Sequence, residues 1–260
     1  MTIKKRILFT YIQIIRYILK RKYIKIFGKT LNGYTWSTRY NYEYITGDYE
    51  EKDTLDRFCS WLREDSVFYD LGANVGYYSF IANQIISKGK IYSFEPMPPN
   101  IDTFNAHLRL NKKKLFNQSI SLMPFAVSDK EKEVVFSSSD MSTEGNTYVN
   151  SDLHSDSAKN LLVKCYSVDG LMEQGYAKPD IIKIDVEGAE FDVLRGAEQT
   201  IAKYHPKIML ATHDCHIQGV QKLCVDFLQQ LGYKLELLSN ENKIMAGLDD
   251  YIAIHSSDKN

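Results

Sequence analysis

Short runs of apolar residues alternate along most of the chain with segments whose apolar positions recur at helical spacing. The runs predict buried strands and the spaced positions predict amphipathic helices. The predicted strands lie at 67–70, 90–95, 121–129 with its exit loop, 134–136, 180–185, 208–213, 233–237 and 251–254. The predicted helices lie at 53–62, 75–85, 101–110, after residue 190, and at 220–231. This alternation predicts a doubly wound α/β sheet with a closing antiparallel pair.

The turn after the first strand has the sequence Asp70-x-Gly72-x-x-x-Gly76. Glycines at such a turn let backbone approach a ligand closely, and the following helix N-terminus presents free N–H groups. The spacing differs from the G-x-G-x-x-G of dinucleotide-binding folds. An acid at the strand end would repel a pyrophosphate but would suit an ammonium group, such as that of S-adenosylmethionine. A tight strand–helix turn without any ligand is the alternative that these residues leave open.

Later strands also end in acids. Glu95 follows the glycine turn by roughly 20 residues, the spacing at which a carboxylate binds ribose hydroxyls in nucleotide-binding folds. A single glutamate at a strand end is otherwise usually a surface residue. The strand at 180–185 ends in Asp185. We expect Asp70, Glu95 and Asp185 to close consecutive parallel strands and to form one pocket.

The composition is that of an ordinary globular protein. The chain has 260 residues, 44% of them hydrophobic and 25% charged, which is enough for one large α/β domain or two small ones. A net charge of −1 argues against nucleic acid as a main partner, because neutralising phosphates needs a basic surface. The four cysteines are widely spaced without a C-x-x-C pair, which predicts reduced thiols in a cytoplasmic protein. They are Cys59, Cys165, Cys215 and Cys224.

The N-terminal segment differs from the rest in charge. Residues 1–29 carry nine Lys or Arg and no acid, and apolar positions between 3 and 27 recur at helical spacing. Arg16 interrupts the apolar run, so no membrane span is predicted. No small-residue cleavage site follows, so no signal peptide is predicted. A basic helix on an acidic membrane surface and a helix packed on the domain both stay open.

Two further segments predict coverings of the domain. Residues 30–50 are aromatic and polar, which predicts short strands or a flap. After the strand at 134–136, a segment rich in Ser, Asp and Asn runs to residue 160. This segment is the best candidate for a mobile loop over the site.

Four segments together resemble the FkbM family of S-adenosylmethionine-dependent methyltransferases: DLGANVGYYSF, FEPMPPN, PFAVSD and IKIDVEGAEFDVLRGA. The likeness runs from about Tyr44 to about Leu238. It implies a class I methyltransferase (Rossmann-like) fold, with a seven-stranded, mainly parallel sheet and helices on both faces. It divides the chain into an N-terminal extension, 1–45, and a methyltransferase domain, 46–260.

The resemblance also implies which residues would bind S-adenosylmethionine. Those at its methionine part would be Asp70, Gly72, Ala73, Asn74 and Gly76. Those at its ribose and adenine would be Glu95, Pro96, Ala126 and Val127. Asp185 and Glu187 would face the methyl group and the acceptor.

Methyl transfer to a hydroxyl is aided by a positioned base that takes the proton. The candidates are Asp185, Glu187 and His213, and a histidine has the suitable pKa range. A structural, hydrogen-bonded His213 is an equally open alternative. In the family, the fifth strand commonly ends in a glutamate one or two residues before a histidine. Here Ala211 and Thr212 precede His213, so that acid is missing.

The run from His213 to His216 contains four potential metal ligands: His213, Asp214, Cys215 and His216. Adjacent residues at a strand end point in different directions, so we expect no metal ion to be held by this run.

The resemblance implies, as the predicted function, O-methylation of a glycan, a lipid-linked saccharide or a secondary metabolite, and the reduced thiols predict a cytoplasmic location. Contact of residues 1–29 with the inner face of a membrane, and a homodimer, stay open. A nicotinamide-dependent oxidoreductase is one alternative, although the missing G-x-G-x-x-G argues against it. A non-catalytic, membrane-apposed binding protein with this fold is another.

Overall fold

The structure is a computed structural model, and it describes residues 34, 36, 52–116, 119–138, 159–238 and 247–258. The predicted N-terminal helix, most of the aromatic segment after it and the polar segment at 139–158 lie outside these residues. Within the described part of the chain, no helix combines the length and the apolar character that crossing a membrane requires.

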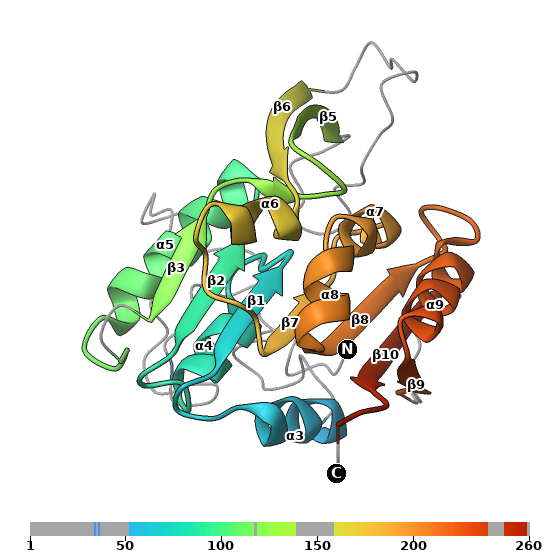
Figure 1. Cartoon of the computed structure of the whole chain (residues 1–260). Coiled ribbons are helices and arrows are strands. Elements are labelled where there is room, and N and C mark those ends of the chain that lie inside the picture. Colours follow the sequence, from blue (N-terminus) through green and yellow to red (C-terminus); the bar gives the residue numbers. More distant parts are fainter. Residues whose placement is uncertain are drawn as a thin grey trace, which may run out of the picture.

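A seven-stranded sheet forms the centre of the described fold (Figure 1). Its strands, in the order in which they pair, are β3 (Ile120–Met123), β2 (Lys90–Phe94), β1 (Val67–Leu71), β7 (Ile181–Ile184), β8 (Lys207–His213), β10 (Leu248–His255) and β9 (Tyr233–Leu237). β10 runs antiparallel to both of its neighbours, and all other pairs are parallel. The predicted mainly parallel sheet with a closing antiparallel pair is confirmed.

Helices cover both faces of this sheet (Figure 1). On one face lie α3 (Lys52–Trp61), α4 (Tyr77–Asn83) and α5 (Pro98–Asn111). On the other lie α6 (Val168–Glu173), α7 (Glu190–Arg195), α8 (Glu198–Tyr204) and α9 (Val220–Gln230). Successive strand side chains point to opposite faces, so Phe68 packs in the first layer and Tyr69 in the second. Helices on both faces are as the sequence predicts.

A second, three-stranded sheet lies beyond the carboxyl ends of the main strands (Figure 1). Its strands, in pairing order, are β4 (Ala126–Val127), β6 (Lys159–Tyr166) and β5 (Lys132–Ser138). Val134, Val163 and Cys165 form its small buried core. The predicted loop ended at residue 160, but β6 begins at Lys159 and pairs antiparallel with β5.

The strand predicted at 121–129 is divided into β3 and β4. Three helices also differ from the sequence prediction or were missed by it. α5 starts at Pro98, three residues before the predicted start at residue 101. Proline is tolerated in the first turn of a helix because the backbone N–H that it lacks would have no partner within the helix there. α6 was missed, since it has only six residues and contains Gly170, although the Ser167 hydroxyl accepts a hydrogen bond from the Gly170 amide and caps its start. α8 was missed because it follows α7 after only two residues.

The layer under α4 and α5 has an aromatic centre at Phe80, which is fully buried. The rings of Tyr34 and Trp36 lie 5.2 Å and 5.3 Å from the Phe80 ring, both edge-on. The Tyr34 hydroxyl donates to Asn83 Oδ1 at 3.1 Å. The described residues of the aromatic segment therefore pack into the domain.

We expect Phe80→Ala to lower the free energy of unfolding by about 3–5 kcal/mol, because it removes a buried ring and leaves a cavity. Urea unfolding followed by circular dichroism measures the change. Leu223→Ala is the matched control, since Leu223 is 49% exposed and its truncation should change stability by less than about 0.5 kcal/mol. Equal losses in both variants would contradict this description of the core.

Candidate functional site

The ends of β1, β2 and β7 are tied together by backbone hydrogen bonds. The amides of Gly72 and Ala73 donate to the Phe94 carbonyl at 3.0 Å and 2.9 Å, and the Asp185 amide donates to the Leu71 carbonyl at 3.1 Å. Asp70, Glu95 and Asp185 therefore come together at one edge of the sheet, as expected from three parallel strands that end side by side.

The backbone conformation and the close packing of the β1–α4 turn require glycine at two positions, 72 and 76. Gly72 has φ +78°, and a Cβ there would lie 1.8 Å from the Asp185 carbonyl oxygen. Gly76 has φ +95°, and its Cβ would lie 2.7 Å from the Phe104 ring. These glycines pack the turn against its neighbours whether or not a ligand is present, so they do not by themselves indicate a cofactor.

Asp70 is 1% exposed and lies beneath the turn. The Ser79 hydroxyl donates to Asp70 Oδ2 at 2.5 Å, which ties the strand end to α4. Asp70 Oδ1 has no hydrogen-bond partner within the described residues. Burial raises the pKa of Asp70, although the nearby Lys183 charge acts against this. Its contact with the methionine part of a cofactor stays a prediction.

Glu95 organises the rim of the site. Its carboxylate accepts hydrogen bonds from the Asn74 amide at 2.9 Å, from the Met97 amide at 2.9 Å and from the Asn100 side chain at 3.2 Å. Burial raises the pKa of Glu95 to about 7, against the lowering effect of these hydrogen bonds. A buried carboxylate is thus held in a fixed orientation at the end of β2.

A cavity opens at this edge, and together with the open space at its mouth its volume is about 800 Å³. The predicted cofactor residues that line it are Gly72, Asn74, Glu95, Pro96, Ala126, Val127 and Asp185. Asp70, Ala73 and Gly76 are not among its lining residues in the described part of the chain. Glu187 lines the cavity too, whereas His213 is not among the lining residues in the described part of the chain.

Sequence reasoning missed the wall that the small sheet contributes to the cavity. Val134 and Phe136 of β5 and Cys165 of β6 line it opposite the acids. The alternation of Leu161, Val163 and Cys165 is a strand pattern that could have revealed β6.

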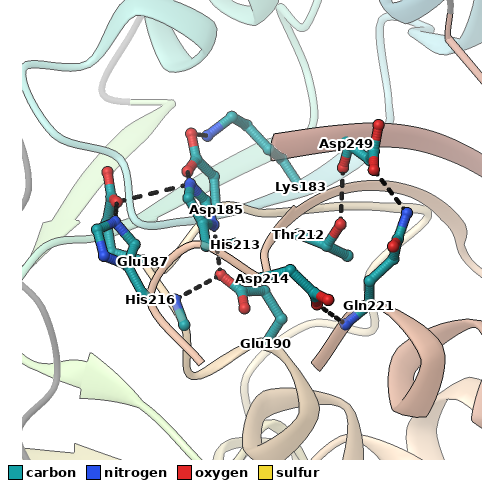
Figure 2. Close-up of polar contacts among 11 residues, drawn as sticks. Lys183, Asp185, Glu187, Glu190, Thr212, His213, Asp214, His216, Gln221 and Asp249 are labelled. Atoms are coloured by element: carbon teal, nitrogen blue, oxygen red, sulfur yellow. Dashed lines mark hydrogen bonds and ion pairs between the residues drawn. The ribbon is translucent and has the colours of Figure 1, made fainter. Parts of the chain in front are cut away.

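A second cluster of acids and histidines lies where β7 and β8 end (Figure 2). His213 Nε2 lies 3.6 Å from Asp185 Oδ1 and 3.6 Å from Glu187 Oε2. His216 Nε2 donates to Glu187 Oε2 at 3.0 Å. Lys183 Nζ donates to Asp185 Oδ2 at 2.9 Å. The three predicted catalytic residues therefore meet in one place.

Glu190 supplies an acid partner for His213. His213 Nδ1 donates to Glu190 Oε1 at 2.7 Å, and the Gly188 amide donates to the same oxygen at 2.8 Å. Glu190 is fully buried and is the first residue of α7. Glu190, which lies 23 residues before His213, thus takes the place of the acid that is missing before His213 in β8. This pairing was not predicted from the sequence.

The charges in this cluster shift its pKa values in opposite directions. Burial would lower the pKa of His213, but the hydrogen bond to Glu190 and the neighbouring carboxylates raise it to about 9. Burial would raise the pKa of Asp185, but Lys183 and His213 hold it below its usual value. Burial and Asp185 raise the pKa of Glu187. Glu187 is therefore more basic than Asp185, its neighbour on the cavity wall.

The residues that follow His213 do not converge on one point. The Asp214 carboxylate accepts hydrogen bonds from the amides of Gly219 and Gln221, at 3.2 Å and 2.7 Å, at the start of α9. Cys215 is exposed. The expectation that the run 213–216 holds no metal ion by itself stays a prediction.

The chain is similar to known methyltransferases. The family model of the methyltransferase FkbM domain matches residues 70–235 of this chain. The hexuronic acid methyltransferase AglP of Haloferax volcanii is 30% identical over 147 residues, which cover 56% of each chain. Methyltransferase sdnD of Sordaria araneosa is 28% identical over 159 residues, covering 50% of this chain and 60% of that one. The matches thus span little more than half of the length of these relatives.

A solved structure shows the same fold. Methyltransferase FkbM from Methylobacillus flagellatus aligns with a TM-score of 0.55 at 17% identity, over 75% of this chain and 44% of that one. Together with the sheet order, this alignment confirms the class I methyltransferase fold.

Proposed function

The chain belongs to the FkbM family of methyltransferases, and we propose that it transfers a methyl group from S-adenosylmethionine to a hydroxyl of a saccharide or a similar small acceptor. The observation that carries this proposal is the cavity at the carboxyl edge of the sheet. Its walls carry the carboxylates of Glu95, Asp185 and Glu187.

The cavity fits a positively charged nucleoside better than a dinucleotide. Its lining residues in the described part of the chain include no Lys or Arg, so a pyrophosphate would face only carboxylates and would be repelled. Glu95 lines the cavity and is the carboxylate that would accept hydrogen bonds from ribose hydroxyls, and Ala126, Val127 and Phe136 offer an apolar surface for a base. These features favour S-adenosylmethionine over a nicotinamide cofactor.

The protein's own part in the reaction is binding, orientation and proton removal. S-adenosylmethionine, when bound, supplies a methyl group on a sulfonium sulfur. Glu187 stands on the cavity wall with a raised pKa, so its carboxylate is the best placed group to take the proton of an acceptor hydroxyl. Asp185 is the weaker base because it is paired with Lys183. His213 acts behind Glu187 by holding it in position.

The proposed class of acceptor is based on the name of one similar protein, AglP. The name of AglP states that it methylates a hexuronic acid, so a sugar acid within a glycan or lipid-linked saccharide is the acceptor that we propose first. A secondary metabolite is the second choice. Contact of residues 1–29 with a membrane, a cytoplasmic location and a homodimer remain part of the proposal.

Two measurements test the proposed function. Isothermal titration should show binding of S-adenosylmethionine and none of NAD or NADP. Incubation with S-adenosylmethionine and free or glycan-linked hexuronic acids should then give products heavier by one methylene, by mass spectrometry. Binding of NAD instead would support the oxidoreductase, and cofactor binding without transfer to any glycan or metabolite extract would support a non-catalytic protein.

Lowering the pH from 8 to 6 should weaken the binding of S-adenosylmethionine about tenfold. Glu95 has a pKa of about 7, so it is ionised above this value and gains a proton as the pH falls through it. The protonated carboxyl accepts fewer hydrogen bonds from the ribose. Titration calorimetry at several pH values measures the effect.

Glu95→Gln should bind S-adenosylmethionine more weakly at pH 8 and should lose this pH dependence. Glu236→Gln is the matched control, because Glu236 is exposed on β9 and pairs with Arg57 at the surface. The same pH profile in wild type and Glu95→Gln would show that another group is responsible.

A further inference from the structure

Asp185, Glu187 and His213 each point one potential metal-ligating atom toward a common centre (Figure 2). The three atoms all lie within 4.8 Å of one another, and they come from the ends of two neighbouring strands. We propose that these three side chains bind one divalent transition-metal ion.

The spacing of these atoms matches a coordination shell. His213 Nε2 lies 3.6 Å from Asp185 Oδ1 and 3.6 Å from Glu187 Oε2. Two ligands that are each about 2.1 Å from an ion at a tetrahedral angle lie about 3.4 Å apart. The two distances from His213 are thus within a few tenths of an ångström of this value, and the two carboxylate oxygens lie within 4.8 Å of each other. A site with three protein ligands keeps a further position open.

The surroundings hold these ligands in the required orientation. A metal-binding histidine usually donates its other ring N–H to a carboxylate, which fixes the tautomer and directs the free lone pair at the ion. The fully buried Glu190 carboxylate accepts this hydrogen bond from His213 Nδ1 at 2.7 Å. Asp185 and Glu187 receive hydrogen bonds from Lys183 and His216. Every proposed ligand thus has an outer partner.

The ligand types select the class of ion. One imidazole and two carboxylates suit Zn²⁺, Co²⁺ or Mn²⁺, whereas Mg²⁺ and Ca²⁺ prefer oxygen ligands alone. The charges agree with this choice, because three carboxylates surround His213 and a divalent cation together with Lys183, which pairs with Asp185, would balance them. The competing explanation is a protonated His213 that balances them without any ion.

The position of the ion gives it a role in the proposed reaction. Asp185 and Glu187 line the cavity, so the open coordination position would face the acceptor and hold its hydroxyl oxygen. Glu187 would bind the ion through one carboxylate oxygen and keep the other for the proton of that hydroxyl. This role rests on the proposed function, but binding of the ion does not.

The experiment measures metal binding directly. The full chain, without a histidine tag, is treated with EDTA, dialysed and titrated with CoCl₂ and with ZnCl₂. We expect one equivalent per chain by elemental analysis, and a visible absorption band for Co²⁺ typical of tetrahedral coordination. Glu187→Gln, Asp185→Asn and His213→Gln should each weaken binding by more than about 100-fold, and Glu190→Gln by about 10–100-fold.

The control variant is His255→Gln, which removes one of two stacked surface histidines, His205 and His255, with ring centroids 3.5 Å apart. It should bind the metal like wild type. Glu187 is the most exposed ligand, so Glu187→Gln is the variant whose fold is least at risk, and circular dichroism checks it. Stoichiometric binding that survives Glu187→Gln, binding that is lost in His255→Gln, or no binding at all would each overturn the proposal.

Titration of the EDTA-treated chain with S-adenosylmethionine separates this inference from the proposed function. Metal binding without cofactor binding would leave the metal site standing and contradict the methyltransferase proposal. Cofactor binding without metal binding would contradict the metal site and leave the methyltransferase proposal standing.

Discussion

Gly72→Ala should abolish measurable binding of S-adenosylmethionine and should lower the free energy of unfolding by about 3 kcal/mol or more. The new Cβ would lie 1.8 Å from the Asp185 carbonyl oxygen, and the backbone would keep a φ of +78° that alanine rarely adopts. The carbonyl cannot retreat easily, since the Asp185 amide is bonded to the Leu71 carbonyl. Calorimetry and urea unfolding measure the two effects.

Gly175→Ala is the matched control for this change. Gly175 has a similar φ of +89°, but its added Cβ would meet no atom within 4 Å. It should therefore show only the cost of the backbone conformation, about 1 kcal/mol, and should bind S-adenosylmethionine like wild type. If both glycine variants behaved alike, the contact between the β1–α4 turn and the end of β7 would not be what fixes the cofactor cavity.

Glu187→Gln should lower kcat for methyl transfer by about 10²–10⁴-fold, the usual contribution of a positioned general base. The amide keeps the size of the side chain but cannot take a proton, so binding of S-adenosylmethionine should change by less than about threefold. Transfer of a labelled methyl group to a saturating sugar-acid acceptor measures kcat.

The control for Glu187→Gln is Glu236→Gln, which makes the same chemical change at an exposed position of β9 and should leave kcat unchanged. A loss smaller than about fivefold in Glu187→Gln would remove Glu187 from the role of base. Asp185, which lines the same cavity, would then be the next candidate for the general base.

The central sheet was predictable because its strands are contiguous apolar runs bounded by turns. Val67–Leu71, Lys90–Phe94 and Lys207–His213 all lie close to their predicted positions. The acids at the ends of β1, β2 and β7 could be placed together because parallel strands end at one edge. Elements without long apolar runs, such as α6, were missed.

The pairing of His213 with Glu190 was beyond sequence reasoning for a physical reason. No acid directly precedes His213 in its own strand, and its carboxylate partner comes instead from Glu190 at the start of α7. Likewise, Phe136 and Cys165 reach the cavity only through pairing of β5 with β6 across a long intervening segment. Such contacts depend on tertiary packing, which local patterns do not encode.

The order of strands in the main sheet has a consequence for synthesis of the protein. β1 and β7 are neighbours in space, yet more than 100 residues of chain separate them, and the site also needs His213 from β8. A nascent chain leaving the ribosome therefore cannot complete this pocket until nearly the whole domain has emerged. Translation that stalls before β8 would release a chain with the glycine turn but no reaction centre.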